Sequence, residues 1–553
     1  MAVNQNLSGH PTPPTRPWSL AAVFFILFAA AFLIYGDSLR APFYFDDLTN
    51  IIENPHIHLT RLDLSRIKEI PRGRPTGRSV PFFTFALNYY FHRDQVTGYH
   101  LFNILIHIGC GLMVFLLTGQ TLRLCGRQSL LIPLLAALLW LTHPLHTQSV
   151  TYIVQRINSL AALFYLMALW FYVKFRLSLK NKEPVRFTSS PVLPAAAALG
   201  CGLLALLSKQ NSASLPVIIL LYEWYFFQNR DRSRVKKNWP WLLAMVLSIV
   251  IIALVYLGGN PIDRIMAGYE NQPFNMGQRL LSQGRVVIYY ISLLVFPHPG
   301  RLNIDYDFPV SAGLADPATT ALALAALAAL LAAAGMAQKD RLLSFALIWF
   351  LVTLAVESSF IGLMLVFEHR TYLPSVFPVI ALTAVFFRQV RPVSLAVILL
   401  AAFMAVNGYW TFQRNAVWQD QLGFWRDCAQ KSPNKVRPRN NYGMALAESD
   451  DFEAAVTEYE RSIALSRGTL PYPHNNLGML YFQRGDLTRA AEHFKKAIRT
   501  DPDFFKPYLN LGTLLNRSGD NQRALVFLEE ALRHNRYFPA IHVALAKAYY
   551  ETG

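Results

Sequence analysis

Hydrophobic residues in the first three quarters of the chain fall in long runs separated by short polar connections. Several runs approach the roughly 20 residues that a membrane-spanning helix needs. The pattern predicts an all-α, polytopic membrane domain over residues 19–413, with about eleven spans near residues 19–35, 99–119, 129–147, 152–173, 193–208, 212–228, 239–257, 318–336, 342–361, 372–387 and 393–412. The apolar run Val286–Pro297 is too short to span and is expected to lie flat on the membrane or to re-enter it.

The pattern changes after residue 413 to charged, amphipathic segments with an internal period. The stretch NNLGMLYFQRGDLTRAAEHFKKAIRTDPDF, which begins at Asn475, recurs 34 residues later, and Gly478 aligns with Gly512. This period and the small residues at fixed positions are typical of tetratricopeptide repeats. We therefore expect a linker helix over residues 414–436 and an α-solenoid over residues 437–553, with three repeats and a partial fourth.

Composition agrees with a membrane protein, because 53% of the 553 residues are hydrophobic and 15% are charged. The formal net charge of +17 does not indicate nucleic-acid binding, since the cations are spread over several connections and form no single basic surface. By the positive-inside rule the connections that carry them are cytoplasmic. The first span is expected to be a retained anchor after a cytoplasmic tail, residues 1–18, and the repeats are expected on the opposite face of the membrane.

Polar residues next to the expected spans gather on this opposite face. They form five clusters: Asp46 and Asp47 in the first loop (residues 36–98), HPLHTQ at 143–148, SKQN at 208–211, RLNIDYDFP at 301–309 in the segment 258–317, and FEHRTYLPS at 367–375. Ionisable groups beside a bilayer are costly and mark functional sites by default. Their shared face favours a catalytic pocket over a transporter, whose ionisable residues lie near the bilayer midplane.

The residue types point to transfer from a phosphate-linked donor. Asp46 or Asp47 would accept the proton of an acceptor hydroxyl as a general base, while Lys209 or Arg370 would neutralise a departing phosphate. Each feature also has a plainer interpretation. The two aspartates would then be a solvated turn or a helix cap, and Glu368 and Arg370 a structural ion pair.

The spacing of His143 and His146 resembles a metal-binding pair. A proline between two histidines at a helix end more often indicates interfacial hydrogen bonding than metal ligation. We expect no metal site here, although a divalent metal as a cofactor stays open.

Six motifs, followed by the repeats, carry a resemblance over nearly the whole chain. They are FDD, GRSVPFFTFALNY with GYHLFNILIH (77–108), HPLHTQSVTYIVQRINSLAAL (143–163), LLSKQNSASLP (206–216), RLLSQGRVVIYYISLLVFP with LNIDYDFP (279–309) and EHRTYLPS (368–375). In this order they resemble the transmembrane and tetratricopeptide repeat-containing (TMTC) O-mannosyltransferases and their bacterial relatives. That family is similar to the multi-span GT-C glycosyltransferases.

The resemblance implies transfer of a sugar, mannose in this family, from a polyprenyl-phosphate donor to a protein hydroxyl. It implies that the acidic motif of the first loop falls on Asp46 and Asp47. It also implies a pocket motif at Glu368, His369, Arg370 and Tyr372, and it adds Arg78 to Lys209 and Arg370 at the donor phosphate. His143, His146 and Gln148 are expected in the same pocket because their cluster lies on the same face. Where relatives tend to read Arg-Pro-Leu, this chain reads Arg-Ser-Val-Pro from Arg78 onward. Alanine-rich spans and a short repeat array suggest a bacterial inner membrane with periplasmic repeats.

A non-enzymatic alternative is a membrane-anchored repeat scaffold for an envelope complex. Tetratricopeptide repeats bind peptides or partner helices, and a scaffold needs spans only as an anchor. Eleven spans with polar clusters on one face exceed that need. The repeats are therefore expected to bind the acceptor protein or a partner of the enzyme.

Overall fold

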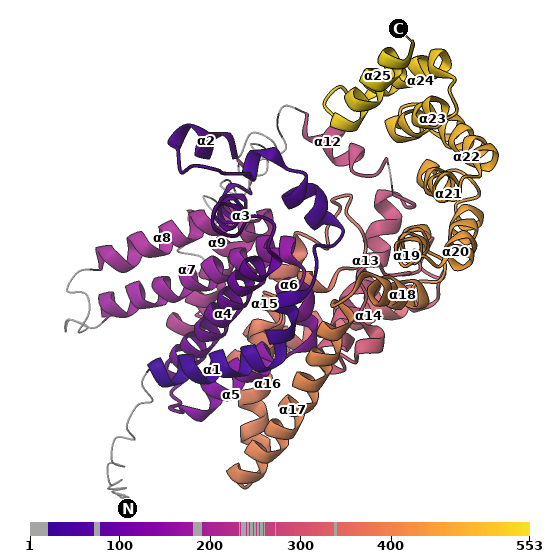
Figure 1. Cartoon of the computed structure of the whole chain (residues 1–553). Helices are drawn as coiled ribbons and strands as arrows, with labels where there is room; N and C mark the ends of the chain where they lie inside the picture. Colours follow the sequence, from indigo (N-terminus) through magenta and orange to yellow (C-terminus); the bar gives the residue numbers. More distant parts are fainter. Residues whose placement is uncertain are drawn as a thin grey trace, which may run out of the picture. The chain divides into compact units, whose positions relative to one another are not determined.

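A computed structural model gives the structure of the chain. It describes residues 20–552 apart from residues 71–77, 181–190, 271 and 337–339 and most of residues 232–259. Every regular element within these described ranges is a helix (Figure 1). The chain divides into a first unit, residues 1–302 and 309–416, and a second unit, residues 303–308 and 417–553.

The first unit contains helices of very different lengths. Their bounds are α1 (Leu20–Tyr35), α2 (Leu64–Glu69), α3 (Ser79–His92), α4 (Val96–Leu124), α5 (Leu131–Leu141), α6 (Thr147–Val150), α7 (Arg156–Lys180), α8 (Val192–Leu206), α9 (Leu215–Tyr222), α12 (Pro261–Ala267), α13 (Met276–Val295), α14 (Thr319–Met336), α15 (Arg341–Ala355), α16 (Val376–Gln389) and α17 (Val393–Val417). The prediction of an all-α unit rich in apolar helices is confirmed.

Five segments in the described part of the chain are long and apolar enough to cross a membrane: Leu20–Arg40, Val96–Leu124, Ile153–Leu179, Thr319–Met336 and Val393–Val417. Four further apolar helices, α5, α8, α15 and α16, are shorter. Each expected span overlaps a described helix except the one at residues 239–257. Most of that range, like the expected tail at residues 1–18, lies outside the described residues. The total number of spans therefore stays a prediction.

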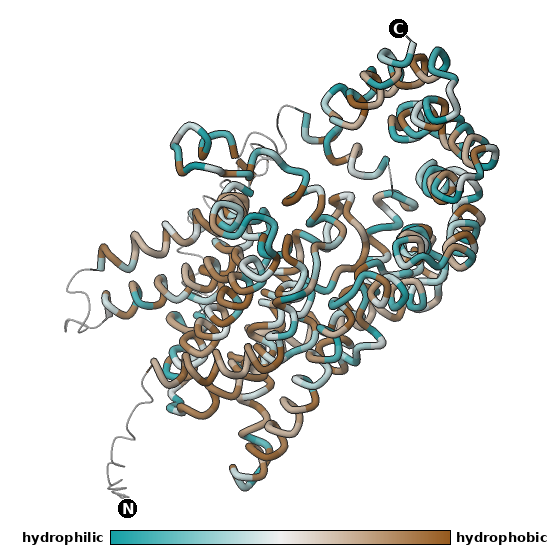
Figure 2. The backbone as a smooth tube through the Cα atoms, in the orientation of Figure 1, coloured by the Kyte–Doolittle hydropathy of each residue, from teal (hydrophilic) through white to brown (hydrophobic). Residues whose placement is uncertain are grey.

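Helix α4 lies at the centre of the hydrophobic core of the first unit. It packs against α1, α5 and α7, and 67% of its most apolar stretch is buried, against 17% for α14 and 22% for α17. Hydrophobic residues run along all of these helices, as the brown tube in Figure 2 shows. Since α14 and α17 expose their apolar side chains, they are the helices suited to face lipid.

Helix α13 is longer than the apolar run Val286–Pro297 indicated. It begins at Met276 with a capping box in which Asn275 and Gln278 bond each other's backbone. Its first turns carry polar side chains, and Arg279 among them donates hydrogen bonds to the carbonyls of Ser359 and Glu357. A hydropathy pattern could not detect these turns, and the position of α13 relative to the membrane stays a prediction.

The second unit is built of paired helices: α18 (Gln421–Lys431), α19 (Val436–Glu448), α20 (Phe452–Leu465), α21 (Pro471–Gln483), α22 (Leu487–Thr500), α23 (Phe505–Arg517), α24 (Asn521–His534) and α25 (Pro539–Thr552). Glycines allow each pair to approach closely. A Cβ at Gly478 would lie 2.7 Å from Phe494, and one at Gly512 would lie 2.6 Å from Leu528. The predicted α-solenoid of tetratricopeptide repeats is confirmed.

Residues 303–308 also belong to the second unit. Asp305 forms an ion pair with Arg437 at 3.1 Å, and the Ser432 hydroxyl donates to the Asp305 carbonyl at 2.5 Å. Asn434 binds the Asp307 carboxylate through its side-chain amide at 2.8 Å. Of the five polar clusters expected at one site, this one binds the repeats instead.

Candidate functional site

The two aspartates of the first loop point in different directions. Phe45 adopts a φ of 49°, a left-handed conformation that a bulky residue rarely takes, and the sharp turn separates the side chains that follow. Asp46 is exposed, and its backbone N–H donates to the Tyr152 hydroxyl at 2.8 Å. Asp47 is buried, and its carboxylate accepts the backbone N–H groups of Val154 at 2.7 Å and Tyr44 at 3.0 Å.

The environment of Asp47 favours its neutral form. Burial raises the pKa of its carboxyl to about 8, against the lowering effect of the Tyr44 and Val154 N–H groups. The nearby charge of Asp46 raises this pKa further. Asp46 is thus the more exposed of the two residues, and Asp47 anchors the loop.

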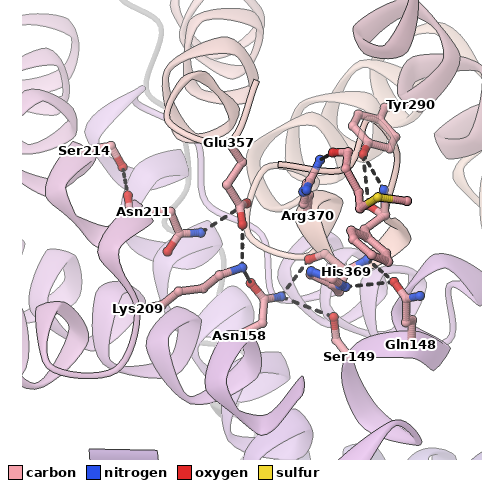
Figure 3. A network of polar contacts seen from close by, with 12 residues as sticks. Gln148, Ser149, Asn158, Lys209, Asn211, Ser214, Tyr290, Glu357, His369 and Arg370 are labelled. Carbon is pink, nitrogen blue, oxygen red and sulfur yellow. Dashed lines mark hydrogen bonds and ion pairs between the residues drawn. The ribbon is translucent and has the colours of Figure 1, made fainter. Parts of the chain in front are cut away.

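Three of the predicted polar clusters are joined through Asn158, in the first turn of α7 (Figure 3). The Lys209 ammonium donates to the side-chain oxygen of Asn158 at 3.0 Å. The side-chain nitrogen of Asn158 donates to the His369 carbonyl at 2.7 Å. The Gln148 side-chain oxygen accepts the His369 backbone N–H at 2.9 Å. Asp47 binds Val154, about one helical turn before Asn158, so the fourth cluster meets the same end of α7.

Lys209 is held by a buried carboxylate. Its ammonium lies 2.6 Å from Glu357, whose other oxygen accepts from Asn211 at 3.5 Å. Burial lowers the pKa of Lys209, Glu357 opposes this effect, and the charges of Arg370 and Arg78 lower the pKa further. The three predicted phosphate-binding cations therefore share one electrostatic environment.

The surroundings of Arg78 and Arg370 support this grouping. The backbone N–H of Val80, in α3 and two residues after Arg78, donates a hydrogen bond to the Leu207 carbonyl at 3.3 Å. The buried Arg78 Nε has no hydrogen-bond partner among the described residues. Arg370 donates to the carbonyls of Met364 and Leu365 at 2.7 and 3.0 Å. Glu357 supplies one negative charge and pairs with Lys209. The cluster of Arg78, Lys209 and Arg370 therefore keeps a net positive charge, which favours binding of an anion.

The same three cations act on His369. Its pKa is lowered well below the usual value, first by burial and then by the charges of Lys209, Arg370 and Arg78. The ring is therefore neutral, with Nδ1 at 2.9 Å from the Gln148 side-chain oxygen. Its neighbour Glu368 is also fully buried.

An apolar groove of about 810 Å³ lies beside this cluster, between α7, α8 and α9. Its walls include Tyr172 and Phe175 from α7, Leu199 and Leu203 from α8, and Leu215 from α9. Ser212 also lines it, and the Ser212 N–H donates to the Lys209 carbonyl at 3.1 Å. One end of the groove is thus close to the backbone of Lys209.

His143, His146 and Tyr372 form a separate aromatic cluster with His107 and Trp140. The Tyr372 hydroxyl lies 2.8 Å from a nitrogen of His107, and His143 bonds the Leu294 carbonyl at 3.0 Å. Both ring nitrogens of the buried His146 have no partner in the described part of the chain. No three His, Cys, Asp or Glu side chains come together as a metal site in the residues that the structure describes.

Several residues of the network were not singled out from the sequence. Glu357 lies just beyond α15, within an expected span, and Asn158 lies in another. Arg156 is fully buried and donates to Asn103, Asn88 and the Tyr99 carbonyl at 2.7, 2.5 and 2.9 Å, which ties α7 to α3 and α4. The rule that charges within spans mark function would have found Glu357 and Arg156.

Comparison with known proteins agrees with both units. Tetratricopeptide-repeat models match residues 436–469, 471–504 and 493–526. Protein O-mannosyl-transferase Tmtc3 of Drosophila melanogaster is 23% identical over 543 residues, which cover 85% of this chain and 57% of that protein. Protein O-mannosyl-transferase F38B6.6 of Caenorhabditis elegans is 24% identical and covers 80% of this chain and 62% of its own length.

Human Protein O-mannosyl-transferase TMTC3 is 24% identical over 84% of this chain and 53% of its own length. The chain thus spans little more than half the length of these relatives. The resemblance carried by the motifs is confirmed: over most of its length the chain is similar to proteins named TMTC protein O-mannosyl-transferases, and it carries tetratricopeptide repeats.

Proposed function

We propose that the chain is a membrane glycosyltransferase of the GT-C class. It moves a sugar, mannose by analogy with its relatives' names, from a polyprenyl-phosphate donor to a protein hydroxyl on the extracytoplasmic face. The gathering of Lys209, Arg370 and Arg78 around one buried carboxylate, beside the loop of Asp46 and Asp47, carries the proposal. Such a cluster suits a phosphate on which negative charge grows during the reaction.

In the proposed reaction the acceptor hydroxyl attacks the anomeric carbon of the sugar. The new bond joins the acceptor oxygen to this carbon, and the bond from the carbon to the phosphate oxygen breaks with inversion. Asp46 takes the hydroxyl proton as general base, since Asp46 is an exposed residue while Asp47 is buried and both of its oxygens accept backbone N–H groups. Polyprenyl phosphate leaves, and its charge is balanced by Arg78, Lys209 and Arg370.

The apolar groove between α7, α8 and α9 supports a lipid-linked donor. An isoprenoid chain would lie against Leu199, Leu203 and Leu215, with its phosphate near Lys209. Each buried CH₂ group would contribute about 0.8 kcal/mol. The repeats would bind the acceptor protein, and a bacterial inner membrane with periplasmic repeats would be the setting.

The decisive test compares Asp46→Asn and Asp47→Asn in the full chain, with a polyprenyl-phosphate-mannose donor and a Ser/Thr peptide acceptor. Loss of proton acceptance typically lowers a rate by 10²–10⁴-fold, and we expect this for Asp46→Asn. Asp47→Asn should reduce the amount of folded protein more than the rate per folded molecule. Transfer at the parent rate by both variants would remove the catalytic proposal and favour the scaffold alternative.

The phosphate site has its own matched variants. Lys209→Met leaves Glu357 buried without its cation, which typically costs about 3–5 kcal/mol of folding free energy. Lys209→Met with Glu357→Gln removes both charges and should restore folding. We expect this double variant to stay deficient in donor binding, measured by competition with polyprenyl phosphate. A double variant with parental donor affinity would show that Lys209 serves the fold alone.

A further inference from the structure

The first unit carries a second group of cations, far from the cluster around Lys209. Helix α7 connects the two groups, because Asn158 in its first turn bonds Lys209, whereas Arg176 near its other end pairs with Glu223 at 2.7 Å. Since an α-helix rises about 1.5 Å per residue, Asn158 and Arg176 are about 27 Å apart along α7. This distance is close to the roughly 30 Å of a bilayer's hydrocarbon core, so we expect the two groups at opposite leaflets.

Two carboxylates of this second group are already paired with arginines. Glu223 accepts hydrogen bonds from Arg176 on both of its oxygens, each at 2.7 Å. Asp340, which precedes α15, forms an ion pair with Arg388 at 2.6 Å. A third acid, Asp231, is exposed to solvent. Glu223 and Asp340 therefore each balance one arginine and no further cation.

Three further arginines of this group, Arg127, Arg230 and Arg341, have no carboxylate within ion-pair distance in the described part of the chain. Arg341, the first residue of α15, donates to the side-chain oxygen of Asn229, the residue before Arg230. Arg127 and Arg341 both act on Cys125: burial raises the pKa of this thiol, and the two positive charges oppose the rise. The three arginines thus come from three different connections and form one positively charged surface.

Two buried N–H groups on this surface lack an acceptor among the described residues: Nη1 of Arg230 and Nε1 of Trp224. Trp224 and Tyr225 lie in the π-helical turn Glu223–Phe227 after α9. The Arg230 guanidinium lies over both rings, 5.8 and 5.2 Å from their centroids, so the two donors are close together. Arg230 and Trp224 are half-buried as residues, which leaves one side of each open to the surface. A phosphate that accepted from both donors would satisfy them, and such charge-assisted hydrogen bonds are strong.

An exposed apolar surface borders these donors. The Tyr225 hydroxyl lies 2.8 Å from the Ser344 hydroxyl, which donates to the Ala334 carbonyl in the last turn of α14 at 2.6 Å. Near this end of α14, the side chains of Leu331 and Met336 are 53% and 79% exposed. Cationic donors at the end of an exposed apolar helix match a molecule with an anionic head and hydrocarbon chains.

We propose that Trp224, Arg230 and Arg341 bind the phosphate of an anionic phospholipid in the expected cytoplasmic leaflet, with its acyl chains against α14. The additional positive charge of Arg127 favours a headgroup with a net negative charge over a zwitterionic one. The bound headgroup would link the turn after α9 to the start of α15. This site is separate from the donor site at Lys209, and the inference goes beyond the proposed function without depending on it.

The test measures lipid binding to the full chain in detergent by native mass spectrometry, without a sugar donor. Phosphatidylglycerol and phosphatidylcholine with identical acyl chains are titrated separately, and the parent should bind phosphatidylglycerol at least tenfold more tightly. Arg230→Gln with Arg341→Gln should lower the affinity for phosphatidylglycerol at least tenfold. Arg123→Gln with Arg391→Gln is the matched control, because it removes the same charge from two exposed arginines in expected cytoplasmic connections, and it should bind as the parent does.

A further comparison needs no altered protein. Soluble glycerol phosphate carries the headgroup without acyl chains, and it should not displace phosphatidylglycerol from the parent at equal concentration. Such displacement would assign the site to a soluble phosphate and overturn the lipid assignment. Equal affinity of the parent for the two lipids, or equal losses in the Arg230→Gln with Arg341→Gln variant and its control, would overturn the inference as a whole. Lipid binding without any sugar transfer would overturn the proposed function alone.

Discussion

At the scale of single residues, the turn at Phe45 gives two adjacent aspartates different environments. Asp46 is exposed, while Asp47 is buried and accepts two backbone N–H groups. The sequence identified the pair but could not separate its members, because the φ of Phe45 and the distant N–H of Val154 are set by the folded chain. The same is true of Lys209, whose partner Glu357 is 148 residues away in the sequence.

The raised pKa of Asp47 predicts a specific pH dependence of stability. Burial raises the pKa of the folded-state carboxyl to about 8, from about 3.9 in an unfolded chain. The protonated carboxyl therefore stabilises the fold fully below about pH 4, and this contribution is lost as the pH rises through 8. The thermal midpoint of the parent should fall more between pH 5 and pH 9 than that of Asp47→Asn, whose amide does not ionise. Parallel pH profiles for the two proteins would contradict the prediction.

At the scale of helices, periodicity predicted elements that pack in a regular way. The 34-residue period located the repeats, because Gly478 and Gly512 are required wherever the first helix of a pair meets the ring or branch of the second. Apolar runs located the apolar helices of the first unit, because length and hydropathy are local properties of the sequence. Helix α13 differs, since Arg279 and Gln283 in its first half bond the carbonyls of Ser359 and Leu365. Those partners come from a distant loop, and no local pattern encodes them.

The close approach of α21 and α22 can be tested with Gly478→Val. The added branches would meet Phe494 and the Ala490 carbonyl, so we expect a loss of roughly 1–3 kcal/mol in the stability of this repeat. Hydrogen exchange should become faster in α21 and α22 in the full chain. Gln483→Val, at the exposed end of the same helix, is the control and should leave exchange unchanged. Unchanged exchange in Gly478→Val would mean that the pair can open at little cost.

At the scale of the whole molecule, the distribution of cations predicts the orientation in the membrane. The positive-inside rule places the N-terminus in the cytoplasm and everything after residue 413 on the other side. A reporter that is active only in the cytoplasm should therefore be inactive when fused after residue 413. An active fusion would reverse the orientation, and with it the proposed access of an extracytoplasmic acceptor. A fusion after Arg127, in an expected cytoplasmic connection, serves as the positive control.

Residues 303–308 give the repeats a second, noncovalent connection to the rest of the chain, because the segment contacts the repeats and continues into the first unit at both of its ends. The polypeptide enters the second unit at Asn303, leaves it after Phe308, and enters again at Val417. A protease that cuts once near Val417 would therefore not release the repeats as a soluble fragment. The ion pair of Asp305 with Arg437 and the bonds of Ser432 would keep the severed part attached. Separation of the repeats after such a cut would also require these noncovalent contacts to break.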